Sequence, residues 1–258
     1  MKSLRERIRR YVCRRLAWTI TNVATDEPLV ALTFDDGPNP EATMELLRIL
    51  EAHAAKATFF MTGENAAVHP EIVSAVRDAG HALGNHSWDH PSFPLILGRE
   101  RREQIRRCAG VLPDGGSRLF RPPYGHQSKA SQWDTWRTGH QVVAWSVAVP
   151  DWEDHTGEWL AEFALERLRP GCVVLLHDGV FDFTGDARTG RGATLDAVER
   201  ILNATRGKYE FVTIPDLLRR GRPARTNWWM EPDIGFLNRL QRSNGIPRRY
   251  RDSRGNQS

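Results

Sequence analysis

Short apolar runs alternate with amphipathic stretches along most of the chain. Between the runs, apolar residues recur near the helical period of 3.6. The runs predict seven strands, at 29–34, 57–62, 81–85, 118–120, 142–147, 172–176 and 209–214. The amphipathic stretches predict helices at 41–53, 70–79, 99–108, 132–137, 156–168 and 193–205, the second with Gly80 as its C-cap.

This alternation predicts an α/β fold in which helices cover the outside of a parallel sheet. A chain of 258 residues suits one large globular domain, and seven parallel strands fit a closed or nearly closed barrel. In such a barrel the loops at the carboxyl ends of the strands build the functional site. We therefore expect chemically useful residues directly after the predicted strands.

Two polar motifs follow the first and third predicted strands. Asp35 and Asp36 are adjacent carboxylates whose mutual repulsion a bound cation would relieve, although an Asp-Gly-Pro sequence also forms ordinary solvated turns. His86 and His90 have a spacing that places two rings on one face of a helical turn, where they can bind one metal ion. The same His-x3-His spacing also arises by chance. His81 lies apart from this pair, and we expect it to be structural.

Three further motifs follow later strands. Arg121 opens a proline-rich loop that can aim a guanidinium at a carboxylate, or it is a surface arginine on a stiff loop. Asp151 and Trp152 offer a charge and an apolar wall, although a tryptophan at this point is more often a packing residue. His177 ends a very apolar strand, where a carboxylate can tune its pKa for acid catalysis; a hydrogen-bonded core histidine is the alternative.

Together these motifs resemble the polysaccharide deacetylases of the NodB-homology type, also called carbohydrate esterase family 4, over roughly residues 29–218. The first three motifs of that family resemble Thr33-Phe34-Asp35-Asp36-Gly37-Pro38, His86-Ser87-Trp88-Asp89-His90 and Arg121-Pro122-Pro123-Tyr124. The fourth and fifth resemble Asp151-Trp152 and Leu175-Leu176-His177.

The resemblance implies a distorted (β/α)7-type, TIM-like barrel forming a single catalytic domain. It implies a hydrolase that removes N-acetyl groups from an amino-sugar substrate and releases acetate. It also implies one divalent metal ion, commonly zinc, with Asp36, His86 and His90 as its ligands.

Two further sets of residues are implied around that metal. The catalytic set contains a general base, a general acid and the partner of each: Asp35 held by Arg121, and His177 paired with Asp151. In the substrate-binding set, the backbone N–H of Tyr124 would stabilise the oxyanion, and Trp152 and Leu175 would enclose the acetyl methyl group.

Two positions depart from the family pattern. Many members have an aspartate three residues before the Asp-Trp pair, where this chain has Ala148. We expect this difference to change a detail of the site rather than the activity. The residues after Tyr124 lack the asparagine often found there and include His126, which we expect to be a solvent-exposed loop residue.

The two ends of the chain are basic and its body is acidic. Residues 1–20 contain seven basic residues and one acidic residue, and 219–258 contain ten arginines and three acidic residues. Within the total of +4, the segment between therefore carries a net charge of −9. An acidic body repels phosphate, so we expect no nucleic-acid partner.

We divide the chain into a basic N-terminal segment (1–28), a deacetylase-like domain (29–220) and a basic C-terminal extension (221–258) whose end we expect to be disordered. Residues 1–18 can form a basic amphipathic helix that contacts an anionic membrane surface or packs on the barrel. In the extension, the pair Trp228-Trp229 can cover the barrel, contact a partner or stack on sugar rings.

The composition also bears on location. No apolar stretch approaches the ~20 residues that span a bilayer, and the N-terminus lacks the apolar region of a signal peptide. We therefore expect a cytoplasmic protein that can contact the inner membrane face. The three cysteines form no disulfide framework, and Cys172 is expected in the core.

The expected substrate is an N-acetylated glycan or glycolipid: a chitooligosaccharide, peptidoglycan or a lipid-linked sugar. Two alternatives remain open, namely a related amidohydrolase or deformylase acting on another small molecule, and a catalytically silent barrel that binds glycan. The presence of both Asp35 and His177 argues against a silent barrel, because such a site needs neither base nor acid.

Overall fold

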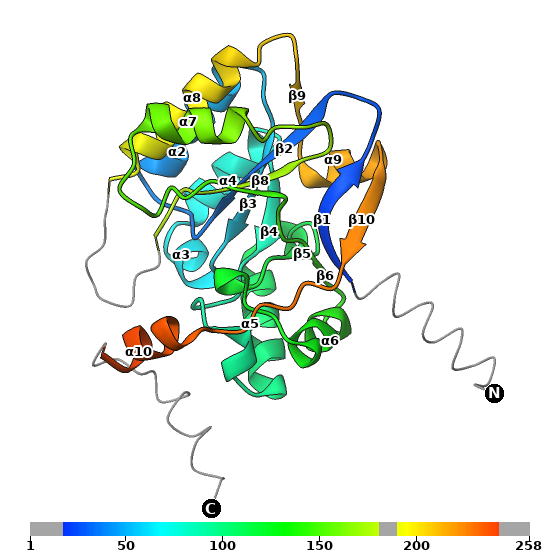
Figure 1. Cartoon of the computed structure of the whole chain (residues 1–258). Coiled ribbons are helices and arrows are strands. Elements are labelled where there is room, and N and C mark those ends of the chain that lie inside the picture. Colours follow the sequence, from blue (N-terminus) through cyan, green and yellow to red (C-terminus); the bar gives the residue numbers. More distant parts are fainter. Residues whose placement is uncertain (1–17, 181–189, 243–258) are drawn as a thin grey trace, which may run out of the picture.

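The computed structural model describes residues 18–180 and 190–242 (Figure 1). Its centre is a parallel sheet in which seven strands follow one another in the order β6-β5-β4-β3-β2-β8-β7. These strands are β2 (Leu29–Asp35), β3 (Ala57–Met61), β4 (Ala82–Asn85), β5 (Leu119–Phe120), β6 (Gln141–Val142), β7 (Val147–Ala148) and β8 (Val173–His177). A further strand, β9 (Glu210–Phe211), pairs with the beginning of β2. The sheet curls into a half-barrel, which confirms the predicted distorted (β/α)7-type fold.

Helices connect the strands and cover the outer face of the sheet (Figure 1). All six predicted helices are present with slightly shifted ends. In chain order the helices of the barrel are α2 (Ala42–Ala52), α3 (Gly63–Val68), α4 (Pro70–Asp78), α5 (Gly98–Val111), α6 (Lys129–Arg137), α7 (Gly157–Leu165), α8 (Gly192–Ala204) and α9 (Ile214–Arg219). Short 3-10 turns occur at Phe93–Leu95, Pro113–Gly115 and Pro123–Gly125. Among the described residues, no helix is both long and apolar enough to cross a membrane.

Local sequence signals explain where several helices begin and end. Thr156 caps α7 by accepting a hydrogen bond from the backbone N–H of Trp159 at 3.2 Å. Gly80 follows α4 with a φ of 79°, the left-handed conformation expected of a C-cap glycine. His81 is buried, and its Nδ1 accepts a hydrogen bond from the N–H of Ala57, so it has the structural role expected of it.

The sheet separates two layers of side chains. Because successive side chains of a strand point to opposite faces, the apolar residues at 32, 34, 174 and 176 pack outward against the helices. Thr33 and Asp35 of β2, and Leu175 and His177 of β8, lie on the opposite face, towards the inside of the barrel. Since β2 and β8 pair with Asp35 next to His177, both side chains project at the carboxyl end of the sheet.

One predicted strand is wrong in its extent. The run at 142–147 forms two short strands, β6 and β7, with an irregular stretch between them. There the backbone N–H of Val143 donates to the carbonyl oxygen of Phe120 in β5, whereas the backbone N–H of Ser146 donates to the carbonyl oxygen of Val173 in β8. The chain thus crosses from one edge of the curled sheet to the other, which an apolar run does not reveal.

The chain ends add a ribbon and a helix. Strand β1 (Thr19–Ala24) pairs antiparallel with β10 (Arg222–Thr226), and α10 (Ile234–Arg242) follows. These elements lie outside the predicted 29–220 domain, whose boundaries stay a prediction. The predicted helix at 1–18 falls almost entirely outside the described residues, as does the end of the C-terminal extension. Cys108 and Cys172 are buried free thiols, so the core position of Cys172 is confirmed.

Candidate active site

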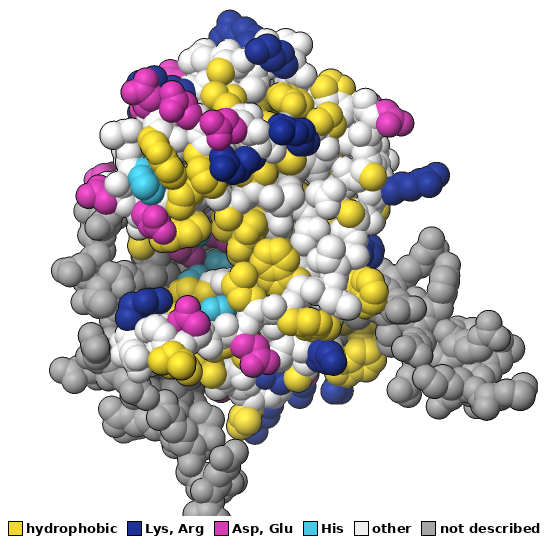
Figure 2. Space-filling view, in the orientation of Figure 1, with side chains coloured by type: hydrophobic (Ala, Val, Ile, Leu, Met, Phe, Trp, Pro, Cys, Tyr) yellow, Lys and Arg dark blue, Asp and Glu magenta, His cyan; other side chains and the backbone are white. Residues whose placement is uncertain are grey.

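A hollow opens on the face shown in Figure 2, and histidine and acidic side chains lie in its depth. The carboxyl ends of β2, β4, β5 and β8 meet at this edge of the half-barrel. Motifs that are far apart in the sequence therefore converge here, as the strand-end prediction requires.

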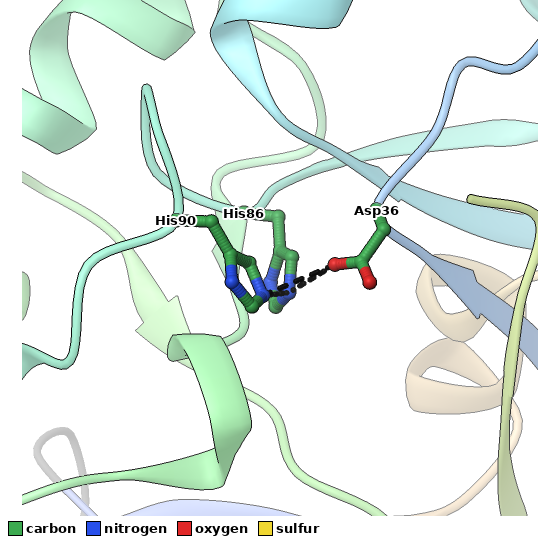
Figure 3. Close-up of side chains that lie close together, drawn as sticks. All are labelled: Asp36, His86 and His90. Atoms are coloured by element: carbon green, nitrogen blue, oxygen red, sulfur yellow. Dashed lines mark hydrogen bonds and ion pairs between the residues drawn. The ribbon is translucent and has the colours of Figure 1, made fainter. Parts of the chain in front are cut away.

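Three potential metal ligands form a compact triangle (Figure 3). Asp36 Oδ1 lies 3.3 Å from His86 Nε2 and 3.1 Å from His90 Nε2, and the two Nε2 atoms are 3.1 Å apart. All three residues are buried. Burial alone would raise the pKa of Asp36, but the two histidines hold it well below its usual range. The carboxylate is therefore ionised and ready to bind a cation.

The triangle fits one divalent metal ion. Donor atoms around a tetrahedral ion with bonds of about 2.0–2.1 Å lie about 3.3 Å apart, close to the observed edges. His86 Nδ1 lies 2.8 Å from the carbonyl oxygen of Arg121, so Nδ1 carries the proton and the lone pair of Nε2 faces the triangle. One carboxylate and two imidazoles leave further coordination positions open, as a catalytic metal site requires.

The segment that carries the two histidines is not a helical turn, so that part of the prediction is wrong. Residues 86–90 form a loop in which Ser87 and His90 have φ angles of 69° and 58°. Asn85 Oδ1 accepts the N–H of Ser87 at 2.9 Å, and Ser87 Oγ accepts the N–H of His90 at 3.1 Å. From α5, Gln104 Oε1 accepts the N–H groups of residues 88 and 89. These bonds hold the strained backbone that aims both rings at one point.

A second group of residues holds the backbone of Asp36, which has a φ of 75°. Asn65 Nδ2 donates to its carbonyl oxygen at 2.8 Å, and the next N–H, that of Gly37, donates to Asp178 Oδ1 at 3.1 Å. Asp178 also accepts a hydrogen bond from the hydroxyl of Thr43. Burial raises the pKa of Asp178 to about 7. This role of Asp178 was not predicted from the sequence, where its signal is the position of a carboxylate directly after His177.

The proposed base, Asp35, is fixed by a fully buried arginine. Arg121 Nη1 donates at 2.7 Å to both Asp35 Oδ1 and Thr33 Oγ1, and Nη2 donates to the carbonyl oxygen of Ala144 at 3.0 Å. Its guanidinium carbon lies 4.1 Å from the ring centre of Phe60. Burial lowers the pKa of Arg121, an effect that Asp35 opposes. The alternative of a surface arginine is therefore wrong.

The proposed acid, His177, is paired with a buried carboxylate. His177 Nδ1 lies 2.7 Å from Asp151 Oδ1, and the backbone N–H of His177 donates to Oδ2 of the same carboxylate at 2.9 Å. Arg191 and Thr194 donate to Oδ2 as well, at 2.5 and 3.0 Å. Burial alone would lower the pKa of His177, but Asp151 raises it to about 9. Neither Arg191 nor Thr194 was singled out in the sequence, because neither follows a strand.

The proposed acetyl-pocket residues lie beside this pair. The ring of Trp152 stands edge-on to His177 with 5.5 Å between ring centres, and 46% of the residue is exposed. Leu175 is 3% exposed, and it is the partner of Ala148 in the β7–β8 pairing. The position that departs from the family pattern therefore lies on the strand next to the pocket.

Tyr124 lies beside His90, one of the three residues of the triangle. It lies in the short turn Pro123–Gly125, has a φ of 58°, and its ring stands edge-on to His90 with 4.4 Å between centres. The neighbouring His126, expected to be exposed, is only 7% exposed, so that expectation is wrong. Its Nδ1 lies 3.0 Å from Ser92 Oγ, and burial lowers its pKa to about 4. The cause is tertiary: Phe236 of α10 packs on it, with ring centres 4.7 Å apart.

Comparison with known proteins gives consistent matches. Residues 22–143 match the family model described as polysaccharide deacetylase. A chitooligosaccharide deacetylase of Azorhizobium caulinodans is 36% identical over 193 residues, which cover 72% of this chain and 92% of that protein. A peptidoglycan-N-acetylglucosamine deacetylase of Bacillus cereus is 35% identical over 199 residues, covering 74% and 68%.

Solved structures agree with these matches. A peptidoglycan N-acetylglucosamine deacetylase in complex with 4-naphthalen-1-yl-N-oxidanyl-benzamide superposes with a TM-score of 0.70 at 30% identity, covering 81% of this chain and 96% of that one. A family 4 carbohydrate esterase from Streptomyces lividans in complex with acetate superposes with a TM-score of 0.66 at 30% identity, covering 79% and 100%.

Proposed function

Since this chain belongs to the polysaccharide deacetylase family of hydrolases, we propose that it is a metal-dependent N-deacetylase of an N-acetylated amino sugar. One observation carries the proposal: a possible metal triad, a carboxylate held by Arg121 and a histidine paired with Asp151 converge in one hollow. These are the groups that amide hydrolysis needs, namely a Lewis acid site, a base and an acid.

Asp36, His86 and His90 would hold the metal ion. When bound, a divalent ion would polarise the acetyl carbonyl group and lower the pKa of a water molecule. Two imidazole nitrogens and one carboxylate oxygen suit zinc, which we propose as the ion. Because all three side chains are buried and preoriented, little rearrangement is needed on binding.

Asp35 would accept the proton of the attacking water. Its Oδ1 is engaged by Arg121, so Oδ2, which lies 3.7 Å from His86 Nε2, is the oxygen that faces the reacting centre. The buried guanidinium keeps the carboxylate in one orientation and is satisfied by backbone carbonyl groups on its other nitrogens.

His177 would protonate the leaving amine. Its Nδ1 is occupied by Asp151, so Nε2–H is the group left to donate. With its pKa raised to about 9, the imidazole carries that proton at neutral pH. Trp152 shields this transfer from water, and Leu175 bounds the space for the methyl group. The backbone N–H of Tyr124 would stabilise the oxyanion.

The decisive experiment is acetate release by purified, zinc-loaded protein. The panel contains chitooligosaccharides, peptidoglycan, a lipid-linked N-acetylated sugar and N-formylated counterparts as probes for a deformylase. We expect acetate from at least one N-acetylated sugar and its loss in Asp35→Asn. Release of formate alone would favour the related amidohydrolase. Zinc and glycan binding without turnover by either protein would favour the silent barrel.

The location of the protein and its contact with a membrane remain predictions from the sequence. We propose a cytoplasmic enzyme whose basic residues 1–18 contact anionic lipid. Cell fractionation tests the location. Sedimentation with vesicles containing anionic lipid, compared with neutral vesicles, tests the contact, and equal binding to both would contradict it.

A further inference from the structure

The chain after β10 runs back across the molecule, below β5 and β6 in Figure 1, and ends in α10. We call residues 227–242 the C-terminal arm. Its first part is bonded to the loop that carries Tyr124. The backbones of Gln127 and Met230 exchange two hydrogen bonds, of 2.7 and 3.1 Å, and Gln127 Nε2 donates to the carbonyl oxygen of Trp228 at 2.8 Å. Trp228 Nε1 donates to the carbonyl oxygen of Gly125 at 3.0 Å.

The second part of the arm packs on the same loop through Phe236. The ring of Phe236 stands edge-on to those of Tyr124 and His126, with 4.9 and 4.7 Å between centres. Asp233 caps α10 by accepting the N–H of Phe236 at 2.6 Å, which fixes where this ring enters the loop. Phe236 and Leu240 are both buried in one apolar cluster with residues of α5, β5 and β6.

These contacts act on a strained backbone. A non-glycine residue with a φ of 58° persists only where its surroundings determine its conformation. At Tyr124 the arm supplies those surroundings on two sides, since Trp228 holds the following carbonyl group and Phe236 holds the ring. The centre of that ring also lies 4.4 Å from the ring centre of His90, so Tyr124 links the arm to a proposed metal ligand.

We propose that the C-terminal arm is a positioning element of the active site. Trp228 and Phe236 fix Tyr124, so that its backbone N–H is aimed at the oxyanion and its ring keeps His90 in place. This inference rests on the proposed deacetylase function. It also gives a role to Trp228, which the sequence left open. The ring of Trp228 packs against Trp145 with 5.0 Å between centres, and its Nε1–H donates to the carbonyl oxygen of Gly125.

The competing explanation is that the arm only stabilises the fold, and matched variants separate the two. Trp228→Phe removes the hydrogen bond to Gly125 and keeps an aromatic ring beside Trp145. Phe236→Ala removes the contact with Tyr124. Leu240→Ala is the control, because Leu240 is buried in the same cluster, whereas the ring contact with Tyr124 is made by Phe236.

Four quantities are measured for each variant: the melting temperature, kcat and KM for acetate release, zinc affinity by chelator competition, and amide hydrogen exchange of a peptide covering 122–127. We expect kcat to fall at least about tenfold in Trp228→Phe and Phe236→Ala with KM changed less than about threefold. Zinc affinity should fall about tenfold in Phe236→Ala, and exchange of the loop should rise in both. Leu240→Ala should have a lower melting temperature, but its kcat, its zinc affinity and the protection of residues 122–127 from hydrogen exchange should match the wild type.

The proposal is overturned if both arm variants keep wild-type kcat, zinc affinity and loop protection. It is also overturned if kcat, zinc affinity and protection of residues 122–127 fall as far in Leu240→Ala as in Phe236→Ala, because the arm would then act through stability alone. If the wild-type protein releases no acetate, the proposed function fails separately. Hydrogen exchange at 122–127 still decides whether the arm holds the loop.

Discussion

The pairing of His177 with Asp151 gives the sharpest quantitative prediction. The substitution Asp151→Asn removes a buried negative charge and keeps a side chain of the same size. Asp151 is the main group that raises the pKa of His177 to about 9 against the lowering effect of burial. We therefore expect the pKa of His177 to be much lower in the variant.

The size of the effect follows from that shift. A return from about 9 to the usual value near 6.5 corresponds to about 3 kcal/mol. The side chain of His177 is 17% exposed, so solvent screens the pair only in part. Arg191, left without its carboxylate partner, pushes in the same direction. At pH 8 the protonated fraction then falls about 30-fold, and kcat should fall with it.

The assay is the pH profile of kcat for acetate release between about pH 5.5 and 10. We expect the alkaline limb of Asp151→Asn to lie about two or more pH units below that of the wild type. A bound dication shifts both limbs in the same direction, so the separation between them is the quantity tested. The control is Thr194→Val, which removes a hydrogen bond to Asp151 but no charge, and its limb should move by less than about half a unit.

A profile of Asp151→Asn with lower kcat but an unmoved alkaline limb would refute this reasoning. Asp151 would then orient His177 without setting its proton affinity. The same pair gives an independent check on metal-free protein. Because the folded-state pKa of His177 is raised, its contribution to stability is complete below about pH 6.5 and is lost as the pH rises through about 9. The difference in unfolding free energy between wild type and variant, measured by urea titration, should shrink over that window.

Three further predictions concern the base, the metal and one close backbone contact. Asp35→Asn should lower kcat at least about 100-fold while zinc binding, measured by chelator competition, stays within about threefold; loss of zinc would assign Asp35 to the ligand set. Dialysis against a chelator should abolish acetate release and zinc should restore it, whereas His90→Ala should not be restored at the same zinc concentration. Gly171→Ala should cost about 3 kcal/mol or more in urea unfolding, because its φ is 80° and a Cβ would lie 1.7 Å from the carbonyl oxygen of Val23. Gly207→Ala, with a φ of 73° and nothing within 4 Å, should cost only about 1 kcal/mol, and equal costs would contradict the role of the close contact.

The sequence alone determined much of the barrel and of the site. Strand and helix periodicity depend on residues that are neighbours in the chain, so the order of elements could be predicted from short windows. The placement of motifs after strands predicted that Asp36, His86 and His90 would lie close together, because parallel strands bring their carboxyl ends to one edge whatever the rest of the fold does.

Only the tertiary structure decided how those residues are held. The strained loop at 86–90 is not the helical turn that the spacing suggested, because Gln104 and Asn85 bond its backbone from outside. Likewise, His126 is buried because a helix more than a hundred residues later covers it with Phe236. Positive φ angles and buried partners depend on contacts between segments that are distant in the chain, and no local pattern of apolar and polar residues records them.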